Sequence, residues 1–497
     1  MSIAYDGVVA SAQSPAATGT MASPAWIAAR INRLPATKSL WKLVALISLG
    51  GWFELYDLFF TGYIAPGLAK SGILTGTTQA FFGFTGIGTF VAVTFAGLFI
   101  GTFFLGFLSD RYGRRFIFTY SLLWYTTATI IMACQTSTEG LLLWRFIASI
   151  GVGVEIITID AYISEMVPRQ MRGRAFAFNQ AVMFSSVPVV AVLSWQLVPI
   201  APFGVEGWRW VVLIGSVGAI IVWFIRRIVP ESPLWLAQNE RGQEADRIVT
   251  QIEAKVAREY GQALPEPVLA TVPLKRVKAG LSEVFRPPYR SRLIMLVIFN
   301  LLQVIGYYGF ANWVPSLLVA KGVEVTKGLA YSAIIAVANP IGPLLGMTFA
   351  DRIDRKWVIV GAALTVAIVG TGFSQFTEPG LLILCGVLIT LANTILSYAY
   401  HAYQVEVFPT AIRARAGGIA YSSSRVGAIS SGFLIAFFLR DFGATGAFGL
   451  ITACMLGIVF VIGVFGPSNR DLDSDDGVCT ENLIRVDDVT ESPKLAE

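Results

Sequence analysis

The fold is decided by Gly106–Arg115, a charged stretch of sequence GFLSDRYGRR that lies between two long apolar runs. A related stretch, Asp351–Lys356, repeats the pattern that begins at Asp110, at an offset of 241 residues. The motif Glu165–Pro168 is repeated as Glu406–Pro409 at the same offset of 241 residues. Because two separate charged motifs share one offset, the sequence predicts a duplicated chain with two related halves.

The composition argues against a soluble protein. Of 497 residues, 55% are hydrophobic and only 14% are charged, whereas soluble proteins contain about 25% charged residues. A chain this apolar must face lipid. The net charge of +5 comes from short basic clusters between apolar runs, so we expect no nucleic-acid partner. The four cysteines lack the spacing of a metal or disulfide framework, and we predict no metal site and no cofactor.

Apolar runs of about 20 residues, each about 30 Å long as a helix, can be counted along the chain. The twelve expected spans are 41–65, 85–108, 116–134, 141–163, 175–199, 208–228, 292–320, 329–350, 357–376, 381–405, 416–439 and 443–466. We therefore predict an all-α integral membrane protein with twelve transmembrane helices. Its expected parts are a cytoplasmic N-terminal segment 1–40, a six-helix bundle 41–228, a central loop 229–291, a second six-helix bundle 292–466 and an acidic disordered tail 467–497.

Basic residues set the orientation in the membrane. They are concentrated before the first span and in alternate loops near 111–115, 169–174, 352–356 and 413–415, and the intervening loops contain fewer of them. By the positive-inside rule, the richer side is cytoplasmic. Both termini and the central loop are then cytoplasmic. We expect a multi-pass protein of the cell membrane that works as a monomer in the lipid bilayer.

The repeated motifs lie at cytoplasmic helix ends, where acids and arginines can pair across neighbouring helices. Such clusters can act as a gate that opens when the pairs break, or they can have a static structural role. The candidate gate residues are Asp110, Arg111, Arg114, Arg115, Glu165, Arg172, Asp351, Arg352, Arg355, Glu406 and Arg413.

The stretch Gly106–Arg115 fits the signature loop of the major facilitator superfamily at every defined position. Three further segments resemble its sugar-porter and metabolite–proton symporter branch: Trp144–Phe146 followed by two glycines, Tyr162–Glu165, and Pro230–Pro233. This resemblance implies two pseudo-symmetric six-helix bundles and transport by alternating access. The resemblance and the compact loops favour a bacterial inner membrane.

The sequence departs from the sugar porters where those proteins bind sugar. They usually carry two adjacent glutamines in the seventh helix, but Gln303 is followed here by Val304. His401 stands at the position that corresponds to their sugar-stacking tryptophan. These departures argue against a hexose. Glu155 and Arg425 resemble instead the branch that carries organic acids and other small metabolites.

Two charges are predicted to pair inside the membrane. Asp57 and Arg145 each lie about 22 Å from the cytoplasmic face if their spans are helical. Their positions also match the aspartate and arginine that the resembling proton-coupled sugar porters keep in the first and fourth helices. Protonation of Asp57 would release Arg145 and let the halves rock. The alternative is a permanent structural ion pair.

Further polar residues in the spans leave two interpretations open. Glu54 is either a second protonation site or a lining residue of the vestibule, and Glu155 is either a proton or substrate site or a packed, protonated acid. Arg425 can bind a substrate carboxylate through two hydrogen bonds, or a neighbouring acid can neutralise it. His401 is either a ligand or pH-sensing residue or a packing residue.

A substrate site near the membrane midplane, between the two halves, is predicted from polar residues in the spans. The candidate substrate-binding residues are Arg425, Gln303, Tyr307, Tyr308, Asn312, His401, Tyr398, Asn393, Asn179 and Gln180.

The function predicted from the sequence is secondary active transport, namely proton-coupled uptake of a small polar metabolite such as an organic acid or a sugar-like compound. The partners are then the substrate and protons. One alternative is a proton-driven efflux antiporter, but Pro188 lacks the preceding glycine of the drug-antiporter motif. Another is a nutrient-sensing receptor with a transporter fold. An enzyme is not expected, since no nucleophile–base arrangement is visible.

Overall fold

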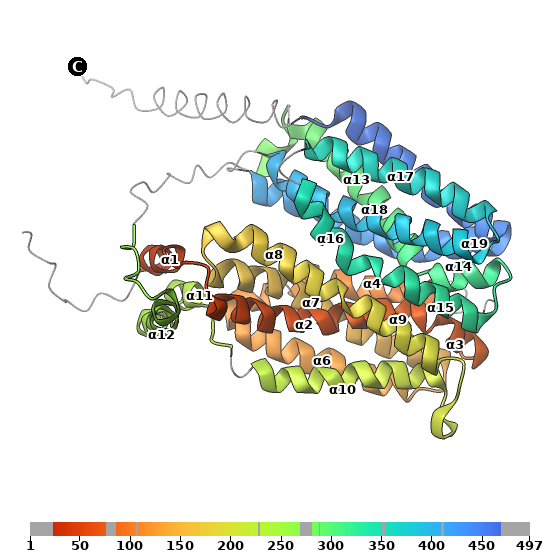
Figure 1. The fold of residues 1–497 in the computed structure, drawn as a ribbon, viewed down its shortest axis with the longest axis horizontal. Coiled ribbons are helices and arrows are strands. Elements are labelled where there is room, and N and C mark those ends of the chain that lie inside the picture. The colour runs from red at the N-terminus through yellow and green to blue at the C-terminus, as the bar shows by residue number, and fades with distance from the viewer. Residues whose placement is uncertain are drawn as a thin grey trace, which may run out of the picture.

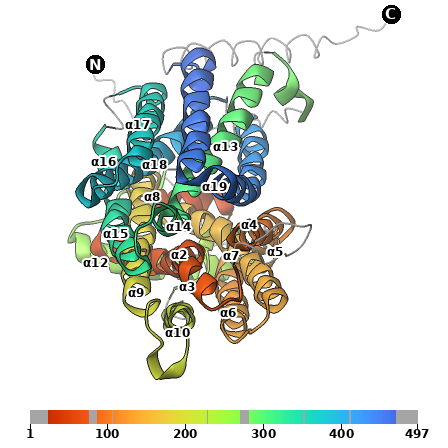
Figure 2. The same ribbon diagram turned by 90° about the vertical axis from the view of Figure 1, so that its right-hand side faces the viewer.

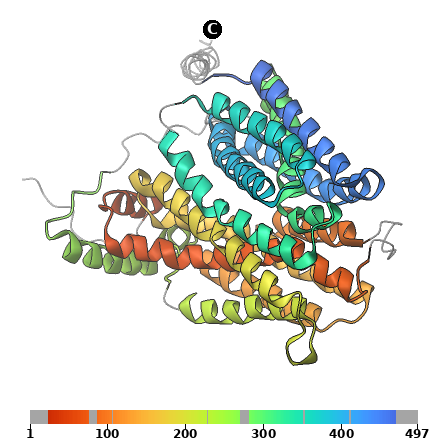
Figure 3. The same ribbon diagram turned by 45° about the vertical axis from the view of Figure 1, so that its right-hand side comes forward.

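A computed structural model describes residues 23–75, 86–105, 107–226, 229–268, 281–287, 289–349, 353–408 and 412–468. Across these ranges the regular structure is helical, as the all-α prediction requires. Figure 1 shows two groups of long helices, one from the red-to-yellow first half of the chain and one from the green-to-blue second half. Figures 2 and 3 show the same division from two further directions.

The first group, residues 38–226, is called the N-half. Its helices are α2 (Lys38–Tyr63), α3 (Ala65–Lys70), α4 (Gly86–Leu105), α5 (Leu108–Tyr112), α6 (Arg114–Ala133), α7 (Thr138–Met166), α8 (Arg169–Phe184), α9 (Ser186–Leu197), the short 3₁₀ helix Pro202–Gly204 and α10 (Gly207–Arg226). Since α8 and α9 follow each other with only Ser185 between them, together they cover the fifth expected span.

The second group, residues 289–465, is called the C-half. Its helices are α13 (Tyr289–Ala311), α14 (Val314–Ala320), α15 (Val325–Ala336), α16 (Ala338–Phe349), α17 (Arg355–Gln375), α18 (Pro379–Glu406) and α19 (Arg413–Phe465). A short 3₁₀ helix, Leu281–Phe285, precedes it. Helix α19 turns at Gly443, whose φ of 65° favours glycine, so its two arms cover the last two expected spans.

Ten helical segments among the described residues are long and apolar enough to cross a membrane, with α19 counted once. The described helices coincide with the expected spans to within a few residues at most ends, because long apolar runs leave little choice of secondary structure in lipid. The number of twelve crossings stays a prediction.

The two halves touch closely at the end of the bundle where α3 and α14 lie, called here the α14 end (Figure 1). A Cβ atom on Gly62 of α2 would lie only 2.1 Å from the backbone oxygen of Asn312. Gly88 of α4 lies as closely against Gly432 and Ala436 of α19. Backbone therefore packs against backbone where the halves meet, and side chains at these positions would hold them apart.

The opposite end of the bundle, called the α12 end, carries three helices outside the two halves. They are α1 (Pro24–Asn32), α11 (Pro233–Gln238) and α12 (Gly242–Tyr260), and they lie together in Figure 1. The segment predicted as a central loop thus contains two helices. Ile27 and Ile31 of α1 pack against Trp235, Leu236 and Val249, which gives this small unit an apolar core of its own.

Arginines of α1 fasten it to α12 through one buried carboxylate. Arg30 donates to both oxygens of Glu253, at 3.1 and 2.6 Å, and Arg33 donates to Glu253 Oε1 at 2.7 Å. Arg30 also pairs with Asp246. Burial works to raise the pKa of Glu253, but these hydrogen bonds outweigh it and hold the pKa below its usual value.

Replacing Glu253 with glutamine is expected to loosen α1. Each lost charge-assisted hydrogen bond contributes about 1.5–3 kcal/mol, so amide hydrogen exchange in α1 should become at least roughly tenfold faster. The control is Glu244→Gln, whose carboxylate pairs with Arg241 at the surface of the same helix. Unchanged exchange in α1 would contradict the fastening role.

The same pair predicts a dependence on pH. Because the folded pKa of Glu253 is lowered, its contribution is complete above the ordinary value of about 4.5 and is lost as pH falls through the lowered folded value. Exchange in α1, corrected for its intrinsic pH dependence, should therefore accelerate in this acid range in the wild type. The Glu253→Gln variant should lack that acceleration.

Candidate functional site

A buried ion pair joins α2 and α7 inside the N-half. Arg145 Nη1 lies 2.8 Å from Asp57 Oδ2, and Nη2 donates to the Asp57 carbonyl oxygen at 2.9 Å. Thr61 and Thr94 accept the remaining guanidinium hydrogen bonds at 2.8 and 2.9 Å. Thr129 of α6 donates to Asp57 Oδ1 at 3.2 Å. The structure thus brings together the two residues predicted to pair, and Arg145 is fully buried.

Aromatic rings pack against one side of this ion pair, and a cavity lies beside it. The Arg145 guanidinium lies 4.6 Å from the centre of the Phe60 ring, a cation–π contact. The cavity lies within the N-half and is lined by Phe53, Tyr56, Asp57, Phe60, Tyr125, Thr129, Val212, Gly215 and Ser216. Asp57 therefore borders a cavity through which a proton could approach it.

A second buried arginine lies in the C-half. Arg425 of α19 is 6% exposed, its Nη2 donates to the Tyr421 hydroxyl at 3.1 Å, and its guanidinium lies 5.0 Å from the centre of that ring. Its Nε has no hydrogen-bond partner among the described residues. Tyr308 and Tyr400 lie near enough for their hydroxyls to interact electrostatically with the guanidinium. An unfilled N–H on a buried cation can receive a ligand anion.

The N-half also contributes buried side chains near the boundary between the halves. Glu54 of α2 is 1% exposed. The ring of Tyr308 lies 4.6 Å from that of Phe95 in α4, so this tyrosine contacts the N-half directly. Tyr308 therefore lies at the boundary between the halves.

His401 lies beside this cluster on α18. Its ring centre is 4.2 Å from that of Tyr400 and 6.1 Å from that of Tyr421, and its Nδ1 lies 2.7 Å from the carbonyl oxygen of Ser397. His401 is exposed, and its role in binding or pH sensing stays a prediction.

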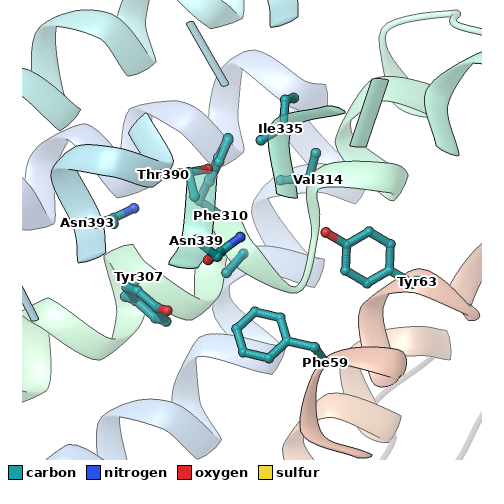
Figure 4. A pocket seen from close by; sticks show the side chains of 10 residues that line it. Phe59, Tyr63, Tyr307, Phe310, Val314, Ile335, Asn339, Thr390 and Asn393 are labelled. Carbon is teal, nitrogen blue, oxygen red and sulfur yellow. The ribbon is translucent and has the colours of Figure 1, made fainter. Parts of the chain in front are cut away.

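A pocket between the halves lies toward the α14 end, and Figure 4 shows the side chains that line it. They are Phe59 and Tyr63 of α2, Tyr307, Phe310 and Ala311 of α13, Val314 of α14, Ile335 and Asn339 of α15 and α16, and Thr390 and Asn393 of α18. The Tyr307 hydroxyl and Asn393 Oδ1 are buried without a hydrogen-bond partner among the described residues. Aromatic walls with free polar groups are suited to a small planar or polyhydroxylated ligand.

Sequence reasoning found Tyr307 and Asn393 but missed most of this lining. Phe59 and Tyr63 are aromatic residues in an apolar helix and give no signal in the sequence. Asn339 and Thr390 are polar residues inside expected spans, and the rule that such residues face a cavity or a neighbouring helix could have found them.

The remaining predicted substrate residues are more dispersed. Gln303 is buried in α13, and Asn312 is buried at the contact with Gly62, where both polar atoms of its side chain lack partners among the described residues. Asn179 is buried in α8 with its Nδ2 3.4 Å from Met183 Sδ, and Gln180 is half-buried beside it. Tyr398 packs against Gly346 of α16.

Glu155 contacts α6 from α7. It is fully buried, and the hydroxyl of Ser121 in α6 donates to its Oε2 at 3.4 Å. The structure thus places this predicted proton-coupling residue inside the N-half.

The predicted gate residues form a cluster in the N-half around Arg114. Its Nη2 lies 2.8 Å from Glu165 Oε1, and its Nη1 pairs with Asp110 and donates to Ser109. The side chain of Glu231 accepts hydrogen bonds from the backbone N–H groups of Arg114 and Arg115 at the start of α6, as an acid at a helix N-terminus does. Burial raises the pKa of Glu231.

Glu231 is a residue that the gate prediction missed. It joins the signature loop to the segment that leads into α11, and its place in Pro230–Pro233 was the available signal.

The other gate predictions have different outcomes. Arg355 pairs with Glu406 in the C-half, which mirrors the Arg114–Glu165 pair. Arg111 lies over the ring of Tyr112, and Arg172 is half-buried in α8. Asp351 and Arg352 lie outside the described residues, and the side chain of Arg413 is likewise not described.

Within the described residues no cluster of acidic, histidine or cysteine side chains could hold a metal ion.

Comparison with known proteins extends over nearly the whole chain. A family model described as "Sugar (and other) transporter" matches residues 43–473. The putative metabolite transport protein YyaJ of Bacillus subtilis is 30% identical over 89% of this chain and 95% of its own length. The niacin transporter NiaP of Acinetobacter baylyi is 29% identical over 89% of this chain and 98% of its own length.

A solved structure shares the fold. The xylose transporter XylE from E. coli, in a partially occluded inward open conformation, superimposes with a TM-score of 0.69 over 87% of this chain and 98% of its own, at 18% sequence identity.

Proposed function

This chain belongs to the sugar (and other) transporter family, and we propose that it takes up a small organic acid together with a proton. It is a multi-pass membrane transporter of the major facilitator fold rather than an enzyme. The proposed location is a bacterial inner membrane with both termini and the α12 end in the cytoplasm, because basic residues cluster at that end.

One observation carries the choice of an organic acid, namely the unfilled Nε of the buried Arg425. A buried guanidinium is costly unless an anion pairs with it, and a substrate carboxylate can occupy two of its N–H groups. The relative NiaP is a transporter of niacin, which is a pyridine carboxylic acid, and this supports a carboxylate over a hexose.

Coupling to protons is proposed from the Asp57–Arg145 pair. Arg145 favours the ionised form of the carboxylate while it lies against it, so Asp57 should accept a proton more readily when the pair separates. Since the pair lies between α2 and α7, its separation would let these helices shift. Proton occupancy would then be tied to the conformation of the N-half.

The test is transport by the purified protein in liposomes that contain an internal pH dye. Nicotinate, benzoate, xylose and arabinose are added one at a time. Acidification triggered by a carboxylate and by neither sugar would support the proposal. Entry of labelled xylose, with no response to any carboxylate, would refute the organic acid. Entry of labelled nicotinate without acidification would refute proton coupling.

A further inference from the structure

We propose that the outer surface of α5 and α6 binds an anionic phospholipid, with the phosphate at Arg111 and Arg115 and an acyl chain along a row of aromatic side chains. This row, called here the aromatic ladder, consists of four residues at intervals of four positions: Tyr112, Phe116, Tyr120 and Trp124. Such a lipid is a partner distinct from the transported substrate.

The members of the aromatic ladder contact one another in order along the chain. The guanidinium of Arg111 lies 5.5 Å from the centre of the Tyr112 ring. The Tyr112 ring lies 6.0 Å from the ring of Phe116, which in turn lies 4.2 Å from the ring of Tyr120. Residues four apart share one face of a helix, and Trp124 follows at the same interval on α6. A cation is thus continued by rings that extend about 12 Å along α6, from Phe116 to Trp124.

The aromatic ladder faces away from the protein interior. Its four side chains are between 45% and 56% exposed, and α6 lies on the side of the N-half that is away from the C-half (Figure 1). Tyrosine and tryptophan in membrane proteins are enriched at the two membrane surfaces, whereas Trp124 lies near the middle of the 20-residue α6. The indole N–H of Trp124 donates to the carbonyl oxygen of Ile147 at 2.8 Å. Its polar group is therefore satisfied by the protein, and the ring can pack against an acyl chain.

Polar groups suited to a phospholipid headgroup lie at the start of the ladder. Arg111 and Arg115 are both exposed there, and Arg111 has no carboxylate partner among the described residues. A guanidinium donates charge-assisted hydrogen bonds to phosphate oxygens. The hydroxyl of Tyr120 makes no hydrogen bond within the described part of the chain, so it can donate to an ester oxygen of the lipid.

The acids around these arginines already have partners. Asp110 and Glu165 both pair with the buried Arg114. The side chain of Glu231 accepts hydrogen bonds from backbone N–H groups at the start of α6. These contacts leave the Arg111 guanidinium for an external anion, and Arg115 adds a second positive charge at the same helix end. Basic residues at a membrane surface attract anionic headgroups, which favours an anionic lipid over a zwitterionic one.

The C-half shows that the fold does not require such a ladder. At the offset of 241 residues, the positions equivalent to the ladder hold Ile353, Trp357, Gly361 and Thr365. Lys356 Nζ lies 5.4 Å from the centre of the Trp357 ring, so the C-half keeps one cation over one ring. Gly361 and Thr365 are exposed and supply no ring to continue the row. The ladder is therefore an addition to the plan that the two halves share, as expected for a binding site in the N-half alone.

The experiment counts lipids bound to the purified full-length protein by native mass spectrometry, with phosphatidylglycerol and phosphatidylcholine of identical acyl chains added in turn. The wild type should bind phosphatidylglycerol at least roughly tenfold more tightly than phosphatidylcholine. Each basic residue near the headgroup contributes a factor of about five in affinity. Arg111→Gln should therefore weaken binding of phosphatidylglycerol about fivefold, and Arg111→Gln combined with Arg115→Gln roughly 25-fold. Tyr120→Phe removes one hydrogen bond and should weaken binding about two- to tenfold.

Matched controls come from the equivalent positions of the C-half. Lys356→Gln and Trp357→Leu should leave binding unchanged, whereas Arg115→Gln and Phe116→Leu should weaken it. Arg111→Lys keeps the positive charge and should retain most of the binding, and it stays informative if a larger change disturbs folding. Glycerol 3-phosphate carries the phosphate without acyl chains and should not compete with the lipid.

Several results would overturn the lipid site. They are equal affinity for the two lipids, unchanged binding in the double arginine variant, and equal losses from the matched substitutions in the two halves. Effective competition by glycerol 3-phosphate would show a site for free phosphate instead. A dimer that forms in the lipid-free wild type and is lost in Phe116→Leu would show that the ladder is an interface between copies of the chain.

Discussion

Replacing Arg425 with glutamine is expected to weaken binding of a carboxylate substrate by roughly 100- to 1,000-fold. Removal of one partner from a buried, hydrogen-bonded charge pair costs about 2–5 kcal/mol, and each 1.4 kcal/mol is about a factor of ten in affinity. Glutamine keeps one amide donor but loses the charge and the paired N–H groups of the guanidinium. The measurement is equilibrium binding of labelled nicotinate to the purified variant.

A neutral ligand and a second arginine serve as controls for the Arg425→Gln variant. Nicotinamide should bind to Arg425→Gln and to the wild type with similar affinity, because it offers no carboxylate. Arg440 lies on the same helix, where it is exposed and pairs with the adjacent Asp441, so Arg440→Gln should leave binding unchanged. If Arg425→Gln binds nicotinate as tightly as the wild type, the carboxylate does not bind at Arg425.

Replacing Asp57 with asparagine is expected to abolish uptake driven by a pH gradient. The amide of asparagine, unlike a carboxyl group, does not bind and release a proton, so proton entry can no longer drive uptake of the substrate. It is nearly the same size as the carboxyl group and can still accept a hydrogen bond from Arg145. Exchange of labelled for unlabelled substrate across the membrane should therefore continue.

The two assays together distinguish coupling from a structural role. Loss of gradient-driven uptake with retained exchange indicates that Asp57 carries the proton. Loss of both would indicate that the pair with Arg145 only holds α2 and α7 together. Thr129→Val removes the hydrogen bond to Asp57 Oδ1 but keeps the carboxyl group, so gradient-driven uptake should persist in that control. Normal gradient-driven uptake by Asp57→Asn would contradict the coupling role.

The sequence predicted the general fold well because few physical solutions exist for such a chain. Apolar runs of about 20 residues must be helical in lipid, and the common offset of the charged motifs indicated two related halves. The Asp57–Arg145 contact could be expected because both charges lie at the same depth and each needs a partner. The same argument suggested that Arg425 needs an anion, but it could not say which acid lies near it.

The parts that the sequence did not reveal depend on contacts between distant segments. Arg30 and Arg33 counted as topology signals, yet they fasten α1 to Glu253 more than 200 positions away. The lining of the pocket between the halves combines residues of both halves, and its aromatic members resemble ordinary packing residues in an apolar helix.

Because α1, α11 and α12 are attached to the N-half, a spin label on α12 can report the position of that half in distance measurements. These helices pack against α2 and α7 and one another, so they should travel with the N-half as a rigid body. A spin label at the exposed Gln251 of α12 should keep its distance to one at Phe116 of α6 throughout a transport cycle. Its distance to a label at Trp357 of α17 should change whenever the two halves move relative to each other. That distance therefore measures the progress of the conformational cycle.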